Sequence, residues 1–323
     1  MVTIAEVAAH AGVAPSTVSY ALSGKRSISA GTRAKVEESV RTLGYSLIPA
    51  ARAERTDVIA LALPLRAGMD LPVVMRFVGA IAEAARGHGL DVLLVTADEG
   101  PEELRAVLEQ RRVDGVLVMD VEMHDERLAV LQELRRPSVL IGFPVDPTGL
   151  TCVDLDFTAA GALCLDHLAD LGHRSVALLG SPKPVYRRET AFAHRTVAGF
   201  SAAAMRRGVS VTTLATEPDV LRTLTELPPA TTGLVVHNES ALPAVLAGLR
   251  TLGKRIPDDV SVVALCPDDL AERVGPAVTS VHIPAVELGR QAVELLSHLR
   301  DRPGAQPSLT LLEPRLTVRG TSG

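Results

Sequence analysis

The chain contains no tryptophan, and phenylalanine and tyrosine together make up only 2% of its 323 residues. Its three cysteines, Cys152, Cys164 and Cys266, are scattered through apolar stretches. Such an odd, unclustered set argues against a disulfide framework or a zinc site, so we expect no metal and a reducing compartment. The sequence also has no unbroken apolar run of about 18 residues, so we expect no membrane span.

The first residues lack the basic segment and apolar stretch of a secretory signal, so we expect a cytoplasmic protein. The formal net charge is −5, but it is unevenly distributed. Residues 1–56 hold seven basic and four acidic side chains, a net +3, which leaves −8 for the remainder. A basic end on an acidic body suits a protein that contacts phosphates with one end only.

The first 45 residues predict three short helices that share one small core. Apolar spacing indicates a helix over 3–10, Gly12 permits a turn, and Pro15 suits the first turn of a second helix. A third helix is expected over 30–43, with Ser29 as its cap. This pattern is typical of a helix-turn-helix, whose second helix lies in the major groove of DNA.

Polar side chains on this segment match the groups that DNA presents. Ser16 and Tyr20 can hydrogen-bond to base edges, and Pro15 can contact a thymine methyl group. We expect four side-chain hydroxyls to contact the phosphates of the DNA backbone, those of Thr3, Thr17, Ser19 and Thr32. On this pattern alone, a helical module for protein contacts, whose hydroxyls only cap helices, stays open as the alternative.

Beyond residue 57, apolar stretches of strand length alternate with amphipathic helical stretches. Strands are expected near 58–63, 91–95, 115–118, 138–142, 175–180, 233–236 and 260–264. Helices are expected near 72–87, 101–111, 125–135, 158–171, 190–207, 239–252 and 285–300. Apolar strands that alternate with helices indicate parallel sheets covered on both faces. About a dozen strands and helices are too many for a single lobe of the mononucleotide-binding type, so two doubly wound lobes are predicted.

Residues 3–45 resemble the headpiece of the lactose-repressor (LacI/GalR) family. The matching marks are T-I-x-x-V-A-x-x-A-G-V, then S-T-V-S, then a T-R-x-x-V run that ends in L-G-Y. The body resembles the periplasmic-binding-protein-like core of the same family at residues 167–179, at 256–265 and at Asn238-Glu239. The similarity covers nearly the whole chain.

The resemblance implies an all-α helix-turn-helix headpiece over 1–48, a hinge or linker over 49–56, and an α/β core over 57–323 for ligand binding and dimerisation. The expected lobes are about 57–155 plus 283–305, and about 156–282 plus the C-terminal strand. The family's function is sequence-specific DNA binding in transcriptional regulation. We therefore expect a repressor that binds a pseudo-palindromic operator as a homodimer. A small molecule between the lobes, a sugar or related metabolite, would control its affinity.

The resemblance also assigns roles in DNA binding. It implies base recognition for Pro15, Ser16 and Tyr20, and backbone contacts for Thr17, Ser19 and Tyr45. The hinge of the family usually reads A-R-S-L, and its leucine wedges between the central base pairs. Glu54 occupies that position here, and a carboxylate is repelled from a narrow groove. We hypothesise that Glu54 weakens this intercalation, while Arg52 and Arg55 still reach phosphates.

Open α/β sheets bind ligands beyond the carboxyl ends of their strands. The side chains expected in such a cleft are Met69, Phe143, Tyr186, Arg195, Thr196, Asn238, Glu239, Cys266 and Asp268. Asn238 follows an apolar strand and precedes a helix, so it would cap that helix, contact a ligand, or do both. The resemblance places this asparagine at an effector contact.

Two cleft positions depart from the family pattern. The family often has an arginine four residues before the aromatic of its A-G-F motif, and counting back from Phe200 gives Thr196, with Arg195 beside it. The aspartate that follows a late strand is replaced by Cys266. With few aromatic residues as well, an ordinary hexose is less expected. Three arginines would either serve an acidic ligand or be plain surface charges: Arg187, Arg188 and Arg195.

No catalytic motif is present: the sequence has no G-x-S-x-G, no Walker loop and no H-E-x-x-H. Asp154 and Asp156 fit a strand-to-helix junction with a capping role. We therefore expect no catalytic residues and no cofactor. The alternative is a cytoplasmic small-molecule binding protein or enzyme whose helical module does not bind DNA. A periplasmic solute-binding protein is disfavoured, because no export signal precedes the body.

Overall fold

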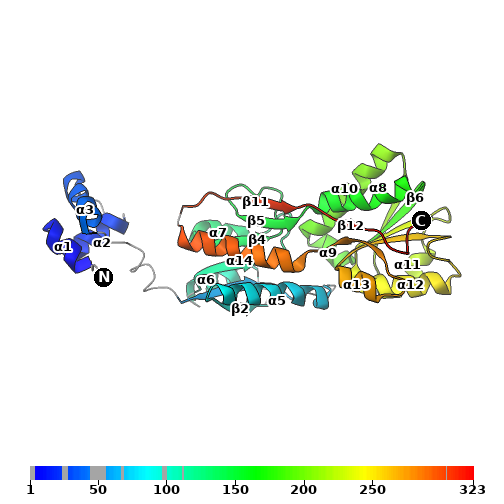
Figure 1. The fold of residues 1–323 in the computed structure, drawn as a ribbon, viewed down its shortest axis with the longest axis horizontal. Helices are drawn as coiled ribbons and strands as arrows, with labels where there is room; N and C mark the ends of the chain where they lie inside the picture. Colours follow the sequence, from blue (N-terminus) through cyan, green and yellow to red (C-terminus); the bar gives the residue numbers. More distant parts are fainter. Residues whose placement is uncertain are drawn as a thin grey trace. The chain divides into compact units, whose positions relative to one another are not determined.

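A computed structural model of the chain describes residues 4–23, 28–43, 56–66, 69–96, 100–110, 113–302 and 304–323 (Figure 1). The chain divides into two compact units, Met1–Arg55 and Thr56–Gly323. The predicted DNA contacts Thr3, Tyr45, Arg52 and Arg55, and the predicted hinge residue Glu54, lie outside the described residues.

The first unit contains the three predicted helices, α1 (Ile4–Ala11), α2 (Pro15–Ser23) and α3 (Ala30–Leu43). Gly12 has a φ of 66°, and this left-handed turn lets the Val13 N–H donate to the carbonyl of Ala8 at 3.0 Å. Ser29 caps α3 as predicted, because its hydroxyl accepts the N–H of Thr32 at 3.1 Å. The buried side chains that hold the helices together are Val7, Ala8, Val18 and Val36.

The first lobe of the second unit is a six-stranded parallel sheet in the order β11-β5-β4-β3-β1-β2. Its strands are β1 (Val58–Ala62), β2 (Asp91–Val95), β3 (Gly115–Val118), β4 (Ser138–Ile141), β5 (Cys152–Leu155) and β11 (Leu309–Leu312). Along β1, Ile59 and Leu61 face the helices α5 (Leu71–Gly87) and α14 (Ala285–Asp301). Ala60 and Ala62 face the other side, with α6 (Pro101–Gln110) and α7 (Arg127–Leu134). This alternation explains why the strands are apolar on both faces.

The second lobe has the sheet order β12-β10-β9-β8-β6-β7, parallel except for the pairing of β12 with β10. Its strands are β6 (Ser175–Gly180), β7 (Ser210–Ala215), β8 (Gly233–Val236), β9 (Ser261–Cys266), β10 (Thr279–His282) and β12 (Leu316–Thr317). One face packs against α8 (Phe157–Asp170) and α10 (Ala191–Arg207). The other packs against α11 (Val220–Thr225), α12 (Leu242–Thr251) and α13 (Asp268–Arg273). The short helices α9 (Lys183–Arg187) and η1 (Glu239–Ala241) follow β6 and β8.

Helices α8 and α10 approach each other closely because each contributes a glycine at the contact. A Cβ atom on Gly161 would lie 2.2 Å from the carbonyl oxygen of Thr196. A Cβ atom on Gly199 would lie 1.8 Å from the carbonyl oxygen of Thr158. Backbone therefore packs against backbone here, and α10 is fixed tightly on the second sheet.

The predicted headpiece and two parallel-sheet lobes are confirmed, and all seven predicted strands are present with small shifts at their ends. Strand β12 is the expected C-terminal strand of the second lobe, whereas four strands, β5, β7, β10 and β11, and three short helices, α9, α11 and α13, were not predicted. The predicted helix over 239–252 is a 3₁₀ turn followed by α12. Strand β11 lies beyond residue 305, where the predicted first lobe ends, and it joins the first sheet. None of the helices in the described ranges is long and apolar enough to cross a membrane.

Candidate functional site

A cavity of about 140 Å³ lies where strands of both sheets end. From the first lobe it is lined by residues that directly follow β1, β3 and β4, namely Leu63, Met119 and Gly142. From the second lobe, Ser181 follows β6 and His237 follows β8. The cavity therefore occupies the position at which open α/β sheets bind ligands.

Three phenylalanine rings, Phe77, Phe157 and Phe192, form much of the apolar lining. The ring centres of Phe157 and Phe192 are 5.5 Å apart, and the His237 ring stands nearly perpendicular to that of Phe192 at the same centre-to-centre distance. These rings make a rigid wall that can cover the apolar face of a small ligand.

Polar groups converge on this apolar lining. They are Asp70, Asp120, Asp154, Ser181, Arg188, His237, Asn238 and Glu239. Asp154 is only 4% exposed, and its Oδ1 accepts the N–H of Leu155 at 2.9 Å. Its Oδ2 has no hydrogen-bond partner among the described residues. Burial raises the pKa of Asp154 to about 7, because the hydrogen bond from Leu155 does not offset the cost of burying the charge.

His237 and Asn238 stand at the end of β8. Burial lowers the pKa of His237 to about 4, so its ring is neutral at physiological pH. Its Nε2 lies 3.5 Å from the Thr196 hydroxyl, and its Nδ1 has no partner in the described part of the chain. The Asn238 side chain makes no capping bond to η1; its Oδ1 accepts the hydroxyl of Ser240 at 2.7 Å. The capping role predicted for Asn238 is therefore not observed.

Glu239 lines the cavity beside Asn238, with Asp70 from the start of α5 close enough to influence its charge. Burial, together with the negative charge of Asp70, raises the pKa of Glu239 to about 8. Asp70 itself caps α5, because its Oδ1 accepts the N–H of Val73 at 3.0 Å. The two lobes thus face each other across the cavity with acidic groups.

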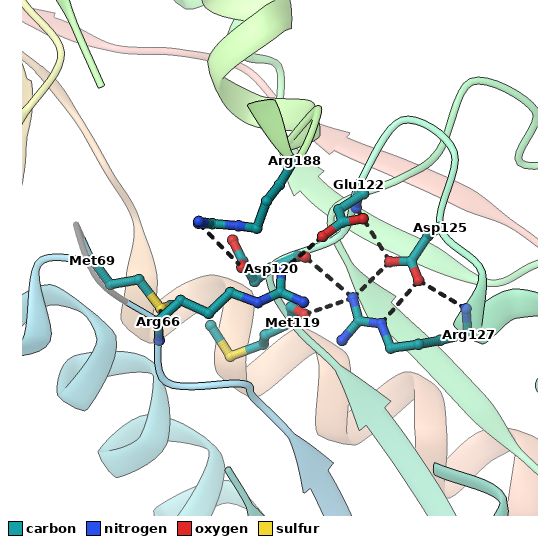
Figure 2. Close-up of polar contacts among 8 residues, drawn as sticks. All are labelled: Arg66, Met69, Met119, Asp120, Glu122, Asp125, Arg127 and Arg188. Carbon is teal, nitrogen blue, oxygen red and sulfur yellow. Dashed lines mark hydrogen bonds and ion pairs between the residues drawn. The ribbon is translucent and has the colours of Figure 1, made fainter. Parts of the chain in front are cut away.

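An ion network fixes the cavity wall after β3 (Figure 2). Arg66 Nη1 donates to Asp120 Oδ2 at 3.1 Å and to Glu122 Oε1 at 2.7 Å. Arg127 Nη2 donates to the carbonyl oxygens of Met119 and Asp120, at 3.2 and 3.1 Å. The Arg127 guanidinium is in turn held by Asp125, at 2.9 Å from Nε and 2.6 Å from Nη2. The segment that carries Asp120 is therefore rigid.

Of the nine predicted ligand residues, Met69, Asn238 and Glu239 line the cavity. The residues that do not line it are Phe143, Tyr186, Arg195, Thr196, Cys266 and Asp268. Arg195 of α10 donates to the carbonyl oxygens of Phe143 and Pro144, at 2.7 and 2.9 Å. Thr196 is fully buried, and its hydroxyl donates to the carbonyl of Phe192 at 2.9 Å.

The other three predicted residues have structural partners. The Tyr186 hydroxyl accepts the N–H of Ser181 at 3.2 Å and so supports the cavity wall from behind. Cys266 is fully buried in the core of the second lobe, and burial raises its pKa to about 12. Asp268 pairs with Arg319 at 3.3 Å, and its backbone N–H donates to His282 Nδ1 at 3.2 Å.

Asp120, Arg188 and His237 also line the cavity, and Arg188 is one of the three arginines that the sequence offered for an acidic ligand. Asp154 lines the cavity as well, although the sequence favoured only a capping role for it. Asp120, Arg188 and His237 lie in stretches that follow strand ends, and this position is the signal that identifies them. Asp154 lies inside β5, and its neighbour Asp156 performs the predicted capping role, accepting the N–H of Ala159 at 2.8 Å.

The predicted DNA-contact residues that the structure describes lie mostly on one helix. Along α2, Pro15, Ser16 and Ser19 are exposed, and Thr17 and Tyr20 are partly exposed. Thr32 lies on α3, with its hydroxyl 2.7 Å from that of Ser29. Within the described ranges, no group of His, Cys, Asp or Glu side chains is arranged to hold a metal ion.

A helix-turn-helix unit followed by two parallel-sheet lobes with a cavity between them defines a class of DNA-binding transcriptional regulators. Residues 3–47 match the family described as bacterial regulatory proteins of the lacI family. Residues 165–322 match the periplasmic binding protein-like domain. Both matches agree with the described fold.

The chain is 30% identical to the HTH-type transcriptional regulator CelR of Thermobifida fusca, over 98% of this chain and 97% of that protein. It is 24% identical to the ribose operon repressor of Escherichia coli over the full length of both. A solved transcriptional regulator CelR-cellobiose complex superposes with a TM-score of 0.73 and 27% identity, covering 100% of both chains. The protein belongs to the LacI family of bacterial regulators, a family of sequence-specific DNA-binding proteins rather than enzymes.

Proposed function

We propose that this protein is a cytoplasmic repressor that binds a pseudo-palindromic operator as a homodimer. A small, uncharged, polyhydroxylated molecule of the sugar class, bound in the cavity between the lobes, controls its affinity for DNA. The observation that carries the ligand class is the combination of carboxylates and aromatic rings in one cavity.

Asp70, Asp120, Asp154 and Glu239 offer acceptors for hydroxyl donors, and Asn238 offers both donors and an acceptor. The phenylalanine rings cover the apolar face of such a ligand. Arg188 is the arginine among the described lining residues, which also include the four carboxyl groups. This set disfavours an acidic ligand, because an anion placed among carboxyl groups would have Arg188 as its one guanidinium partner in the described lining.

The relatives support the same ligand class. One solved homologue is a complex with cellobiose, and one E. coli relative is the repressor of a ribose operon. The basic charge of residues 1–56 and the exposed face of α2 support operator binding. A single headpiece contacts too few base pairs for high specificity, which supports a two-fold pair on a two-fold operator.

The test is a thermal-shift screen of the full-length protein against neutral sugars, nucleosides and organic acids, repeated with operator DNA bound. A neutral sugar should raise the melting temperature of the protein. It should also raise or lower the affinity for the operator, depending on which arrangement of the lobes it favours. Asn238→Ala should abolish the shift, whereas Gln132→Ala, an exposed amide on α7, should keep it. A shift with organic acids alone would contradict the proposed ligand class.

A further inference from the structure

Arg188 follows α9 in the second lobe and lines the cavity beside Asp120 of the first lobe (Figure 2). Its side chain is 22% exposed, and its Nη2 lies 4.0 Å from Asp120 Oδ2. This distance is too long for a hydrogen bond. Neither Nε nor Nη2 of Arg188 has a hydrogen-bond partner in the described part of the chain. Two guanidinium donors are thus buried at the cavity without acceptors.

Asp120 does not depend on Arg188 for its charge balance. Arg66 already donates to the Asp120 carboxylate at 3.1 Å and extends the network to Glu122. Burying a guanidinium without completing its hydrogen bonds destabilises a folded protein. Groups left in this state are concentrated at functional sites, where a ligand completes the bonds.

The arginine that the sequence pattern favoured for this role has another task. Arg195 is bound to the carbonyl oxygens of Phe143 and Pro144 and lies outside the cavity lining. The position four residues before Phe200 holds Thr196, which is buried in the contact between α8 and α10. Arg188 is therefore the guanidinium placed to reach a bound ligand.

We propose that Arg188 is the specificity-determining residue of the effector site. Its donors at Nε and Nη2 form a fork that fits two adjacent oxygens of an uncharged polyol. Other hydroxyls of the same ligand donate to Asp120 and Asp154. Because Arg188 belongs to the second lobe and both aspartates to the first, the ligand joins the lobes and favours one lobe arrangement. This inference rests on the proposed function of the cavity.

The first test compares Arg188→Met with Arg187→Met, which changes the exposed neighbouring arginine at the end of α9. The probes are cellobiose, D-ribose and D-xylose, with binding measured by calorimetry on the full-length protein. For the sugar that binds the wild type, Arg188→Met should lose at least about tenfold in affinity, and Arg187→Met should stay within about twofold. Arg188→Lys should not restore binding, because an ammonium lacks the planar fork. Wild-type affinity in Arg188→Met would overturn the proposal and leave the proposed function standing.

The second test needs no ligand. If the Arg188 donors are unsatisfied without effector, Arg188→Met should melt at the wild-type temperature or higher. Arg127→Met should melt several degrees lower, because it leaves Asp125 buried without its partner. If Arg188→Met is destabilised as much as Arg127→Met, Arg188 is a structural residue and the proposal is wrong. If none of the sugars binds the wild type, the proposed ligand class fails, and this melting comparison still decides the role of Arg188.

Discussion

The guanidinium carbon of Arg195 lies 3.4 Å from the centre of the Phe143 ring. Arg195 belongs to α10 of the second lobe, and Phe143 follows β4 of the first. Stacking and two hydrogen bonds to carbonyl oxygens make this arginine a tie between the lobes. An additional tie joins the Met123 N–H to the carbonyl of Glu189 at 2.8 Å. The two lobes are therefore joined to each other by residues that do not line the cavity.

Arg195→Ala should destabilise the core. Hydrogen bonds to a charged group contribute about 1.5–3 kcal/mol each, and the ring contact adds about 0.5–1 kcal/mol, so a loss of about 3.5 kcal/mol or more is expected. Urea unfolding of the full-length protein measures it, with the exposed Arg187→Ala as the control. Equal unfolding midpoints for the two variants would show that Arg195 is not a tie.

Asp154 predicts a specific pH dependence of stability. Burial raises its folded-state pKa to about 7, whereas an unfolded aspartate titrates near 3.9. The folded state therefore binds a proton more tightly, and the protein loses stability as the pH rises from about 4 to 7. Above pH 7 the full cost of the buried charge is present.

Asp154→Asn removes that charge with little change in shape. In urea unfolding it should stabilise the protein more at pH 8 than at pH 5, relative to the wild type. The exposed Asp91→Asn is the control and should show no such difference. The same gain at both pH values would show that Asp154 has an ordinary pKa.

The sequence predicted the strands with continuous apolar runs and missed those interrupted by polar residues. Strand β5 contains Asp154, and β7 has the edge-strand sequence S-V-T-T-L-A, whose polar residues are tolerated because one side has no neighbouring strand. The short helices α9, α11 and α13 are five or six residues long and have too few turns for a helical period to emerge.

The site was predicted less completely than the fold. Asn238 and Glu239 follow an apolar strand, so their place in the cavity could be predicted from the chain. Arg195 and Thr196 lie on adjacent positions of α10, and their directions depend on how that helix packs against α8 and the first lobe. Spacing along the sequence does not contain this tertiary information, and it pointed to the wrong arginine for the cavity lining.

Glycine at the contact between α8 and α10 gives a prediction about packing. Gly161→Ala places a methyl group 2.2 Å from the carbonyl oxygen of Thr196, so the helices must separate, at a cost of about 1–3 kcal/mol or more. Gly79→Ala in α5 is the matched control, since a Cβ there has nothing within 4 Å. That change should stabilise the helix by about 0.5–1 kcal/mol. Opposite signs in thermal unfolding support the account, and equal effects contradict it.

Asp114 anchors the first residues of the core. Its carboxylate accepts the N–H groups of Thr56 and Asp57, each at 3.0 Å, and Arg300 Nη2 at 2.7 Å. Burial alone would raise the pKa of Asp114, but these hydrogen bonds outweigh it and lower the pKa. Its contribution is therefore present at neutral pH and is lost only as the pH falls through the lowered pKa.

Asp114→Asn should reduce the free energy of unfolding by about 2 kcal/mol at pH 7. The difference from the wild type should stay constant between pH 8 and 5 and shrink only in stronger acid. Urea titrations across this range measure it, with Asp91→Asn as an exposed control. A difference that disappears already at pH 6 would contradict the lowered pKa.

The most direct test of the central claim is selection of binding sequences by the full-length protein from a pool of random double-stranded DNA at low salt. We expect a single pseudo-palindromic site to be enriched. On that site, Ser16→Ala on the exposed face of α2 should lose about tenfold in affinity or more. Thr42→Ala, an exposed hydroxyl on α3, should bind like the wild type. If no sequence is enriched, or Ser16→Ala binds the selected site as tightly as Thr42→Ala, the headpiece does not read DNA as described.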